Sequence, residues 1–360
     1  MSAKILVWGA TGFTGKLVTS ALRQRGLDFA IGGRSREKLD ALAAQLGGVE
    51  TVVASVDDAR SIERALEGRE VVCAVAGPFG LVGEPVFAAA ARRGVHYLDT
   101  TGEQDFVLKM AGRYHEAAEK SGATMVSAFA YEIALADWAA SLAASELAKR
   151  PERIDVVYSA LGAGTSRGTR LSMARIAGEG GVYLDDGRHK PERVGGDVKT
   201  FSMPWGKATA ASFPSPEVYT VPRHTGADTV RVYMAVPKTL ARVVHVAGPV
   251  LKVALRAAAP VLPTIVEKTS VGPDEASRSR ARFTIRAEAR AGGEMASATL
   301  QGIDPYGITA AIIALGAQRL LREPKPKAGV LAASELISPR EALEDLGAHG
   351  FPVEVVTKKH

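Results

Sequence analysis

The chain opens with an apolar run that leads directly into three regularly spaced glycines: residues 4–15 read KILVWGATGFTG. The run has the composition of a buried strand, and residues 16–25 are compatible with a helix. At such a junction Gly9 lets the chain turn sharply, Gly12 lets the backbone approach a pyrophosphate, and Gly15 lets helix and strand pack closely. The spacing predicts the first βαβ unit of a dinucleotide-binding domain, with phosphates held by N–H groups at the helix N-terminus.

A second apolar run, residues 28–33 (DFAIGG), ends in a basic cluster. In this fold an NAD site places Asp or Glu near the end of the second strand, whereas an NADP site places groups there that suit a 2′-phosphate. The chain has Arg34, Ser35 and, one turn later, Lys38. Arg34 can bind the phosphate in bidentate fashion, and Ser35 can donate a further hydrogen bond. We therefore expect NADP as the cofactor.

Composition limits the classes of protein that fit. The 360 residues are 46% hydrophobic and 23% charged, the balance of a globular protein long enough for two domains. The net charge of +6 is modest and the basic residues are scattered, so nucleic acid is not an expected partner. Cys73 is the single cysteine, which excludes a disulfide within the chain and a cysteine-based zinc site. The first strand leaves no room for a signal peptide, and we expect a cytoplasmic enzyme.

Strand and helix patterns alternate through the first third of the chain. The expected strands after the second are 51–54, 71–75, 95–98 and 124–127. The alternation predicts an α/β fold whose N-terminal domain, residues 1–130, is a Rossmann domain with a doubly wound parallel sheet. Right-handed crossovers bring the carboxyl ends of these strands to one edge, where the cofactor crevice is expected.

The pattern changes after about residue 147. Strand composition recurs at 154–160, 230–236 and 280–290, and the last of these alternates as RARFTIRAEAR. Alternation of apolar and charged residues predicts a sheet with one wet and one covered face. We expect residues 131–305 to form a second α+β domain on an antiparallel sheet, for substrate binding and for pairing into a homodimer. Residues 306–360 are expected to pack back on the first domain.

Residues 240–266 are apolar for long stretches but contain Lys252, Arg256 and three prolines. Charges near the centre of a membrane-spanning helix are costly, so spanning is not expected. Two interpretations stay open. These residues form helices that cover an apolar substrate pocket, which we favour, or an amphipathic patch that lies on a lipid surface.

Several motifs together carry a family resemblance: GATGFTG, GGRS, AVAGPFGLVGEPV, HYLDTTGE and the late GPDEASRSRARF. They resemble the saccharopine dehydrogenase-like oxidoreductases, particularly the branch of trans-acting enoyl reductases. The resemblance implies a Rossmann domain with NADP and a substrate domain inserted before C-terminal elements that return to the first domain. It also implies reduction of a conjugated or imine double bond, on a lipid or polyketide-like substrate. The chain departs from that branch at residues 128–137, where an enoyl reductase has Cys-Gly-Phe-Asp-Ser and this chain has AFAYE.

The expected site residues follow from these positions. Tyr131 and Glu132, just beyond the last Rossmann strand, are the candidate catalytic residues: Tyr131 is our first choice to donate a proton, and Glu132 is expected to relay it. Phe79 is expected to offer a flat wall to the nicotinamide, and Glu103 to orient a ribose or the substrate. The full set expected to hold the cofactor is Gly9, Thr11, Gly12, Phe13, Thr14, Gly15, Arg34, Ser35, Lys38, Asp57, Ala76, Gly77, Pro78, Phe79, Gly102 and Glu103. Histidine spacing indicates no metal, and no hydrolase motif is present.

Three functions remain open. The first is an NADPH-dependent oxidoreductase that reduces a C=C (enoyl) bond of a hydrophobic, carrier-linked or lipid-linked substrate. The second is C=N (imine) reduction or a saccharopine-type amino-acid dehydrogenation, which needs cations for substrate carboxylates; Arg167, Arg170 and Arg175 are the nearby cluster. The third is a non-catalytic NADP-binding protein on a lipid surface. Hydride transfer is the chemistry of the cofactor, so the protein needs few conspicuous catalytic groups.

Overall fold

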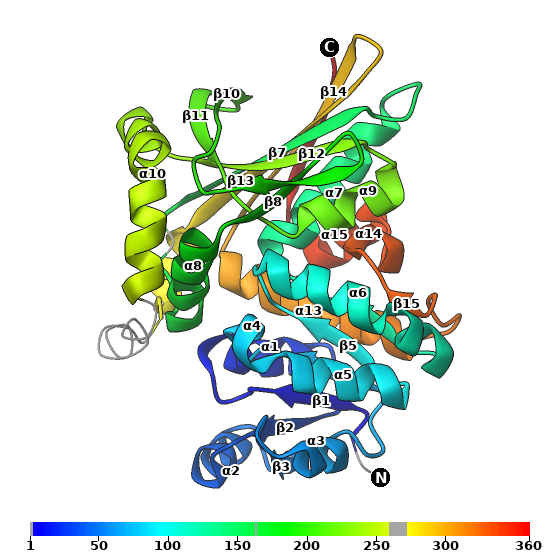
Figure 1. Ribbon diagram of the computed structural model, residues 1–360. Helices are drawn as coiled ribbons and strands as arrows, with labels where there is room; N and C mark the ends of the chain where they lie inside the picture. The colour runs from blue at the N-terminus through cyan, green and yellow to red at the C-terminus, as the bar shows by residue number, and fades with distance from the viewer. Residues whose placement is uncertain (1–2, 163, 259–271) are drawn as a thin grey trace. The chain divides into compact units, whose positions relative to one another are not determined.

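The computed structural model describes residues 3–162, 164–258 and 272–360, and its contacts divide the chain into two compact units (Figure 1). The first unit comprises Met1–Thr101, Asp105–Tyr131 and Tyr306–Phe351. The second comprises Gly102–Gln104, Glu132–Pro305 and Pro352–His360. Each unit is built around its own sheet.

The first unit contains a parallel sheet of seven strands in the order β15-β6-β5-β4-β1-β2-β3. Its strands are β1 Ile5–Trp8, β2 Phe29–Gly33, β3 Thr51–Val53, β4 Val71–Ala74, β5 His96–Asp99, β6 Thr124–Val126 and β15 Gly329–Val330. The chain moves outward from β1 to β3 in one direction and from β4 to β6 in the other. This reversal between β1 and β4 confirms the predicted doubly wound Rossmann arrangement.

Helices connect these strands, and their starts follow ordinary capping rules. The Ser35 hydroxyl accepts from the Lys38 amide at the start of α2, and Asp58 accepts from the amides of Arg60 and Ser61 at the start of α3. The helices are α1 Phe13–Gln24, α2 Arg36–Gln45, α3 Ala59–Ala65, α4 Phe79–Val82, α5 Glu84–Arg93, α6 Gln104–Ser121, α13 Pro305–Leu321, α14 Ala333–Leu336 and α15 Pro339–Ala348.

The second unit contains a sheet in the order β10-β11-β12-β7-β13-β14-β16, with β8 paired to β12 and β9. Its strands are β7 Arg153–Leu161, β8 Gly181–Asp185, β9 Arg188–Glu192, β10 Val198–Met203, β11 Gly206–Ser212, β12 Thr229–Ala235, β13 Arg282–Ala291, β14 Glu294–Ile303 and β16 Glu354–Lys359. The sheet is antiparallel, as expected, except that β12 runs parallel to β7. Parallel neighbours require a long crossover, and residues 162–228 between these two strands provide it.

The alternating strand β13 differs from its expected environment. We expected its charged face to be wet, but Thr284, Arg286 and Glu288 are only 4%, 7% and 5% exposed. The charges pair with one another: Glu288 contacts Arg286 at 3.2 Å and Arg290 at 2.8 Å, and Arg290 also contacts Asp155 of β7 at 3.1 Å. Opposite charges on adjacent positions satisfy each other, so this polar face is buried instead of solvated.

The C-terminal segment divides between the units. Residues 306–351 lie in the first unit, where β15 pairs with β6, but β16 pairs with β14 in the second sheet. This corrects the expectation that all of 306–360 packs on the first domain. The reason is that β14 offers an unpaired edge, which the strand-forming sequence EVVTKK completes.

The remaining helices of the second unit are α7 Tyr131–Ser145, α8 Arg167–Glu179, α9 Glu217–Thr225, α10 Lys238–Ala258 and α12 Glu275–Arg280. Figure 1 shows α8 and α10 packed side by side. The stretch 240–266, expected to be a lid or a lipid-surface patch, is a single helix as far as residue 258. The rest of that stretch, 259–266, lies outside the described residues.

Candidate functional site

The glycine loop after β1 lies directly against the loop after β4. Gly9 has φ of +86°, which glycine adopts without strain, and a Cβ atom at Gly9 would lie 2.7 Å from the Cβ of Ala76. The Gly9 amide donates to the carbonyl of Gly32 in β2 at 2.9 Å. The loop is therefore fixed at the point where the strand order reverses, which is where open α/β sheets bind ligands.

Gly15 and Gly12 have different roles in this loop. A Cβ at Gly15 would overlap the carbonyl oxygen of Gly9 and lie 2.6 Å from that of Ala10, so helix α1 meets the loop at a distance that only glycine permits. Gly12 is exposed and has an ordinary φ of −74°, and a Cβ built on it would lie 3.3 Å from the carbonyl oxygen of Gly9. It is the N-cap of α1 and offers no side-chain cap, and the first turn carries no acidic side chain. The backbone N–H groups in the first turn of α1 thus suit an anion.

Other members of the predicted cofactor set surround the loop. Thr11 and Thr14 are half-buried, and Gly33 comes within 4.0 Å of the Thr11 hydroxyl when a Cβ is built on it. The ring of Phe13 packs edge-on against Tyr306 of α13, with centroids 5.0 Å apart. Phe13 therefore fixes the start of α1 to a helix of the C-terminal segment.

The basic cluster follows β2 as predicted. Arg34 is exposed, and within the described residues it forms no ion pair. Lys38 is exposed one turn later. The Ser35 hydroxyl accepts from the Lys38 amide at 3.3 Å, so Ser35 also serves as the N-cap of α2, a role that we did not predict. Asp57 is exposed after β3, and its carboxylate accepts from the Ser55 hydroxyl at 3.3 Å.

The loop after β4 divides into an accessible part and a packed part. Gly77 is exposed, and Ala76 and Pro78 are half-buried, as a cofactor-facing segment requires. Phe79 is only 5% exposed, and its ring packs against Phe106 with centroids 5.8 Å apart. The Phe79 ring therefore lies in the core of the first unit. Its expected contact with the nicotinamide ring stays a prediction.

Gly102 and Glu103, predicted to reach the cofactor, belong to the second unit. Glu103 is fully buried, and its carboxylate accepts from the Ser172 hydroxyl at 2.8 Å and from Arg175 at 2.6 Å. Both partners lie on α8, so Glu103 anchors that helix. A Cβ at Gly102 would lie 3.8 Å from the carboxylate of Glu132, which places this loop beside the start of α7.

The chain passes from the first unit to the second between the two candidate catalytic residues. Tyr131 is half-buried, and its amide donates to the Thr309 hydroxyl at 3.2 Å. The Glu132 residue is half-buried, and loss of solvation on burial raises the pKa of its carboxyl from 4.5 to about 7. A carboxyl with this pKa is partly protonated at neutral pH and can donate a proton.

Two further acidic groups lie near Glu132: Asp137, within the segment 128–137 singled out in the sequence, and Glu217, which was not predicted. Glu217 of α9 is fully buried, and neither oxygen of its carboxyl has a hydrogen-bond partner among the described residues. Burial, and then the charges of Glu132 and Asp137, raise its pKa well above the ordinary value. Asp137, also fully buried, lies 2.8 Å from Nε2 of His224. Glu217 and His224 are seven residues apart and share a helix face, a spacing that indicates a buried polar stripe on α9.

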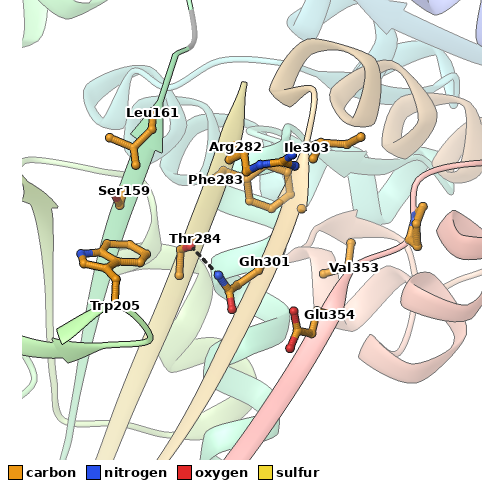
Figure 2. Close-up of a pocket in the computed structure, with 12 residues that line it drawn as sticks. Ser159, Leu161, Trp205, Arg282, Phe283, Thr284, Gln301, Ile303, Val353 and Glu354 are labelled. Atoms are coloured by element: carbon orange, nitrogen blue, oxygen red, sulfur yellow. Dashed lines mark hydrogen bonds between the residues drawn. The ribbon is translucent and has the colours of Figure 1, made fainter. Parts of the chain in front are cut away.

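A separate cavity of about 530 Å³ lies on the second sheet and contains none of the predicted residues (Figure 2). Three exposed apolar residues border it: Trp205 at 51%, Leu161 at 64% and Ile303 at 37% exposure. Arg282 and Glu354, of opposite charge, lie on different strands of its floor, and neither has an ion pair among the described residues. The cavity is therefore an open groove with apolar walls and unpaired charges.

The described residues offer neither a metal site nor a membrane-spanning helix. In the parts of the chain that the structure describes, no group of three His, Cys, Asp or Glu side chains is arranged to hold a metal ion. None of the described helices combines the length and the apolar character needed to cross a membrane.

The family model and the curated relatives each match little more than a third of this chain. Residues 5–126 match the family model of the saccharopine dehydrogenase NADP binding domain. A trans-acting enoyl reductase of Mycobacterium ulcerans (strain Agy99) is 33% identical over 135 residues, which are 36% of this chain and 32% of that protein. A saccharopine dehydrogenase-like oxidoreductase of Bos taurus is 30% identical over 151 residues, or 37% and 35% of the two chains. A lipid droplet localized protein of Caenorhabditis elegans is 32% identical over 145 residues, or 37% and 34%.

The matched part of the chain thus spans about a third of the length of these curated relatives. The fold as a whole resembles apo histidine-tagged saccharopine dehydrogenase (L-Glu forming) from Saccharomyces cerevisiae, with a TM-score of 0.65 and 12% identity. That comparison covers 99% of this chain and 100% of the other, and it confirms the fold class. The glycine loop and the basic end of β2 both lie within residues 5–126, the part of this chain that matches the saccharopine dehydrogenase NADP binding domain.

Proposed function

We propose that the protein is an NADPH-dependent oxidoreductase that reduces the C=C bond of a hydrophobic, carrier-linked or lipid-linked enoyl substrate. The observation that carries the proposal is the glycine loop held against Ala76 and followed, after β2, by Arg34, which is exposed and forms no ion pair with the described residues. The names of the relatives, an enoyl reductase and an oxidoreductase, support the reaction class.

The residues present fit NADPH. The space above Gly12 is free of side chains and suits a pyrophosphate, and Arg34 with Lys38 suits a 2′-phosphate. Gly77, exposed after β4, lets the nicotinamide half approach the backbone. Bound NADPH would supply the hydride for one carbon of the double bond.

The other carbon of the double bond then requires a proton. Glu132 is our first candidate donor, because the raised pKa of about 7 keeps a fraction of its carboxyl protonated at neutral pH. Tyr131 is the second candidate. The carboxyl oxygens of Glu217 have no hydrogen-bond partner in the described chain, and burial together with the charge of Glu132 raises the pKa of that carboxyl.

Imine reduction of an amino-acid derivative is less well supported. That reaction requires cations that are free to bind substrate carboxylates. Arg175 of the candidate cluster is instead 2.6 Å from Glu103 and 3.0 Å from Glu179, so its charge is neutralised within the protein. The remaining arginines of the cluster do not by themselves make a site for two carboxylates.

The test is NADPH oxidation measured against a panel of enoyl thioesters and cyclic imines. We expect turnover with the enoyl thioesters, and none with Gly12→Val, whose side chain fills the pyrophosphate space. Turnover of imines alone would contradict the proposal, and NADPH binding without turnover would favour a non-catalytic protein. Glu132→Gln and Tyr131→Phe identify the donor, because its loss should lower kcat by about a hundredfold to ten-thousandfold with NADPH affinity unchanged.

We also propose that the protein pairs as a homodimer through the groove on the second sheet. A two-fold axis that exchanges the positions of Arg282 and Glu354 would place each beside its opposite charge in the other copy. Trp205 of each copy would then cover the apolar wall of the other, in keeping with the aromatic anchors of protein interfaces.

A further inference from the structure

Helix α10 carries a continuous apolar stripe that faces solvent. Val243, Val246, Val250 and Val253 follow one another at spacings of three and four residues, and they are 59%, 78%, 73% and 69% exposed. At 100° per residue these positions lie on one face of the helix, which Leu240, 46% exposed, extends toward the N-terminus. Isolated exposed valines are ordinary, but a stripe of this length marks an interaction surface.

The opposite face of α10 fixes the helix to its own unit, so the stripe cannot simply turn inward. Ala241 is fully buried, and the side chain of Val244 packs against Gly195. Arg193 donates to the carbonyl of His245 at 2.9 Å, and the His245 ring lies 2.8 Å from the carbonyl of Gly195. The helix is held by side chains and hydrogen bonds on one face and presents apolar residues on the other.

The charges of α10 are all of one sign. Its sequence, KTLARVVHVAGPVLKVALRAA, contains two lysines and two arginines but no aspartate or glutamate. Lys238, Arg242 and Arg256 are exposed and lie within about 40° of one another on the helix wheel, directly beside the apolar stripe. Among the described residues none of these three has an acidic partner. An apolar face flanked by unpaired basic residues is the pattern of helices that lie in a membrane interface.

We propose that α10 is a membrane-surface helix that binds the protein to anionic phospholipid bilayers. The valines would enter the boundary between headgroups and acyl chains, and the three basic side chains would contact anionic headgroups. A second copy of the chain is a poorer partner, because stacking two such stripes would bring like charges together. The inference rests on α10 alone and is independent of the proposed reductase activity.

The first measurement is flotation of the full chain with vesicles of phosphatidylcholine, with or without 30% phosphatidylserine. We expect binding to the anionic vesicles that weakens as salt is raised, and little binding to neutral ones. Val246→Ser/Val250→Ser should weaken binding by about a hundredfold, since each change removes most of one valine from the apolar layer. The matched control is Val355→Ser/Val356→Ser on β16, which alters two exposed valines elsewhere and should bind as the unchanged protein does.

Charge is tested in the same way. Arg242→Ala and Arg256→Ala should each weaken binding by about fivefold, whereas Arg188→Ala, exposed on β9, should have no effect. The depth at which α10 enters the bilayer is measured with a fluorophore attached to Val246→Cys. Labelling is selective because the only native cysteine, Cys73, is fully buried and should not react. We expect a blue shift with anionic vesicles at this position, and none at Val355→Cys.

Three outcomes would overturn the proposal. They are absence of binding to anionic vesicles, equal binding by the two double-serine variants, and a blue shift that depends on protein concentration without vesicles. The last result would identify the stripe as a contact between copies. NADPH titration of the same variants separates this test from the proposed function, because the α10 substitutions should leave cofactor affinity unchanged.

Discussion

The contact between Gly15 and the loop after β1 makes a sharp prediction for Gly15→Ala. In a helix where the new methyl group meets nothing, glycine to alanine stabilises by about 1 kcal/mol. At Gly15 the Cβ would overlap the Gly9 carbonyl oxygen and lie 2.6 Å and 2.7 Å from the carbonyl oxygen and carbon of Ala10. These are backbone atoms, which cannot rotate away as a flexible side chain can.

The cost can be worked out from the bonds that must move. Overpacking of this kind costs about 1–3 kcal/mol. Displacing Gly9 also strains two hydrogen bonds, from the Gly9 amide to Gly32 at 2.9 Å and from the Gly12 amide to Gly9 at 3.0 Å. Each is worth about 0.5–1.5 kcal/mol. After subtracting the gain in helix propensity, we expect Gly15→Ala to lose roughly 1–5 kcal/mol of unfolding free energy.

The matched control is Gly112→Ala. Gly112 lies in helix α6 of the same unit, is exposed, and has no atom within 4 Å of a Cβ built on it. It should therefore raise the thermal midpoint by roughly 2–4 °C, while Gly15→Ala lowers it. Thermal unfolding followed by circular dichroism, together with NADPH titration, measures both effects. A Gly15→Ala protein as stable as the Gly112→Ala protein, with unchanged NADPH affinity, would refute the role given to this contact.

Three other predictions concern charges. Arg34→Ala should weaken NADPH by roughly tenfold to a hundredfold and leave NADH nearly unchanged, as titration calorimetry can show; equal losses would remove Arg34 from the 2′-phosphate site. Burial raises the pKa of Glu132 from 4.5 to about 7, so the folded state holds this proton more tightly. The stabilisation of the folded state by this proton is fully present below pH 4.5, and about 3 kcal/mol of unfolding free energy is lost as the pH rises through 7. Urea unfolding of Glu132→Gln should lack this pH dependence. The same pH dependence in Glu132→Gln and the unchanged protein would show that Glu132 titrates normally. Arg282→Glu and Glu354→Arg should each disrupt the proposed dimer, and mixing the two variants should restore it in sedimentation; unchanged masses would place the interface elsewhere.

The parallel sheet could be predicted because its signals are local. A buried strand followed by a glycine turn specifies its own geometry, as Gly9 and Gly15 show. The preference for NADP could be predicted in the same way, because Arg34 immediately follows strand β2. Each inference used residues within one strand, turn and helix.

The features that the sequence did not reveal depend on distant partners. The burial of the charged face of β13 requires Asp155 on another strand, which period-two alternation cannot supply. Glu217 lies far along the chain from Glu132, and neither has a motif that connects it to the other. The carboxylate of Glu103 binds α8 through two residues about 70 positions away, a contact that no local pattern could predict. The packing of the buried Phe79 ring against Phe106 likewise joins residues of two separate helices.

The way the chain is shared between the two units has a consequence for folding during synthesis. The ribosome completes β1 to β6 early, but their edge partner β15 and the buried helix α13 emerge only after the whole inserted unit. The inserted sheet in turn lacks β16 until residues 354–359 leave the exit tunnel. Both sheets therefore have an unpaired edge strand until late in synthesis. Pairing of strands so distant in the sequence is slow, and the unpaired edges are prone to aggregation. Neither unit can be expressed from a single uninterrupted segment, and a chaperone that shields strand edges should raise the yield of the folded protein.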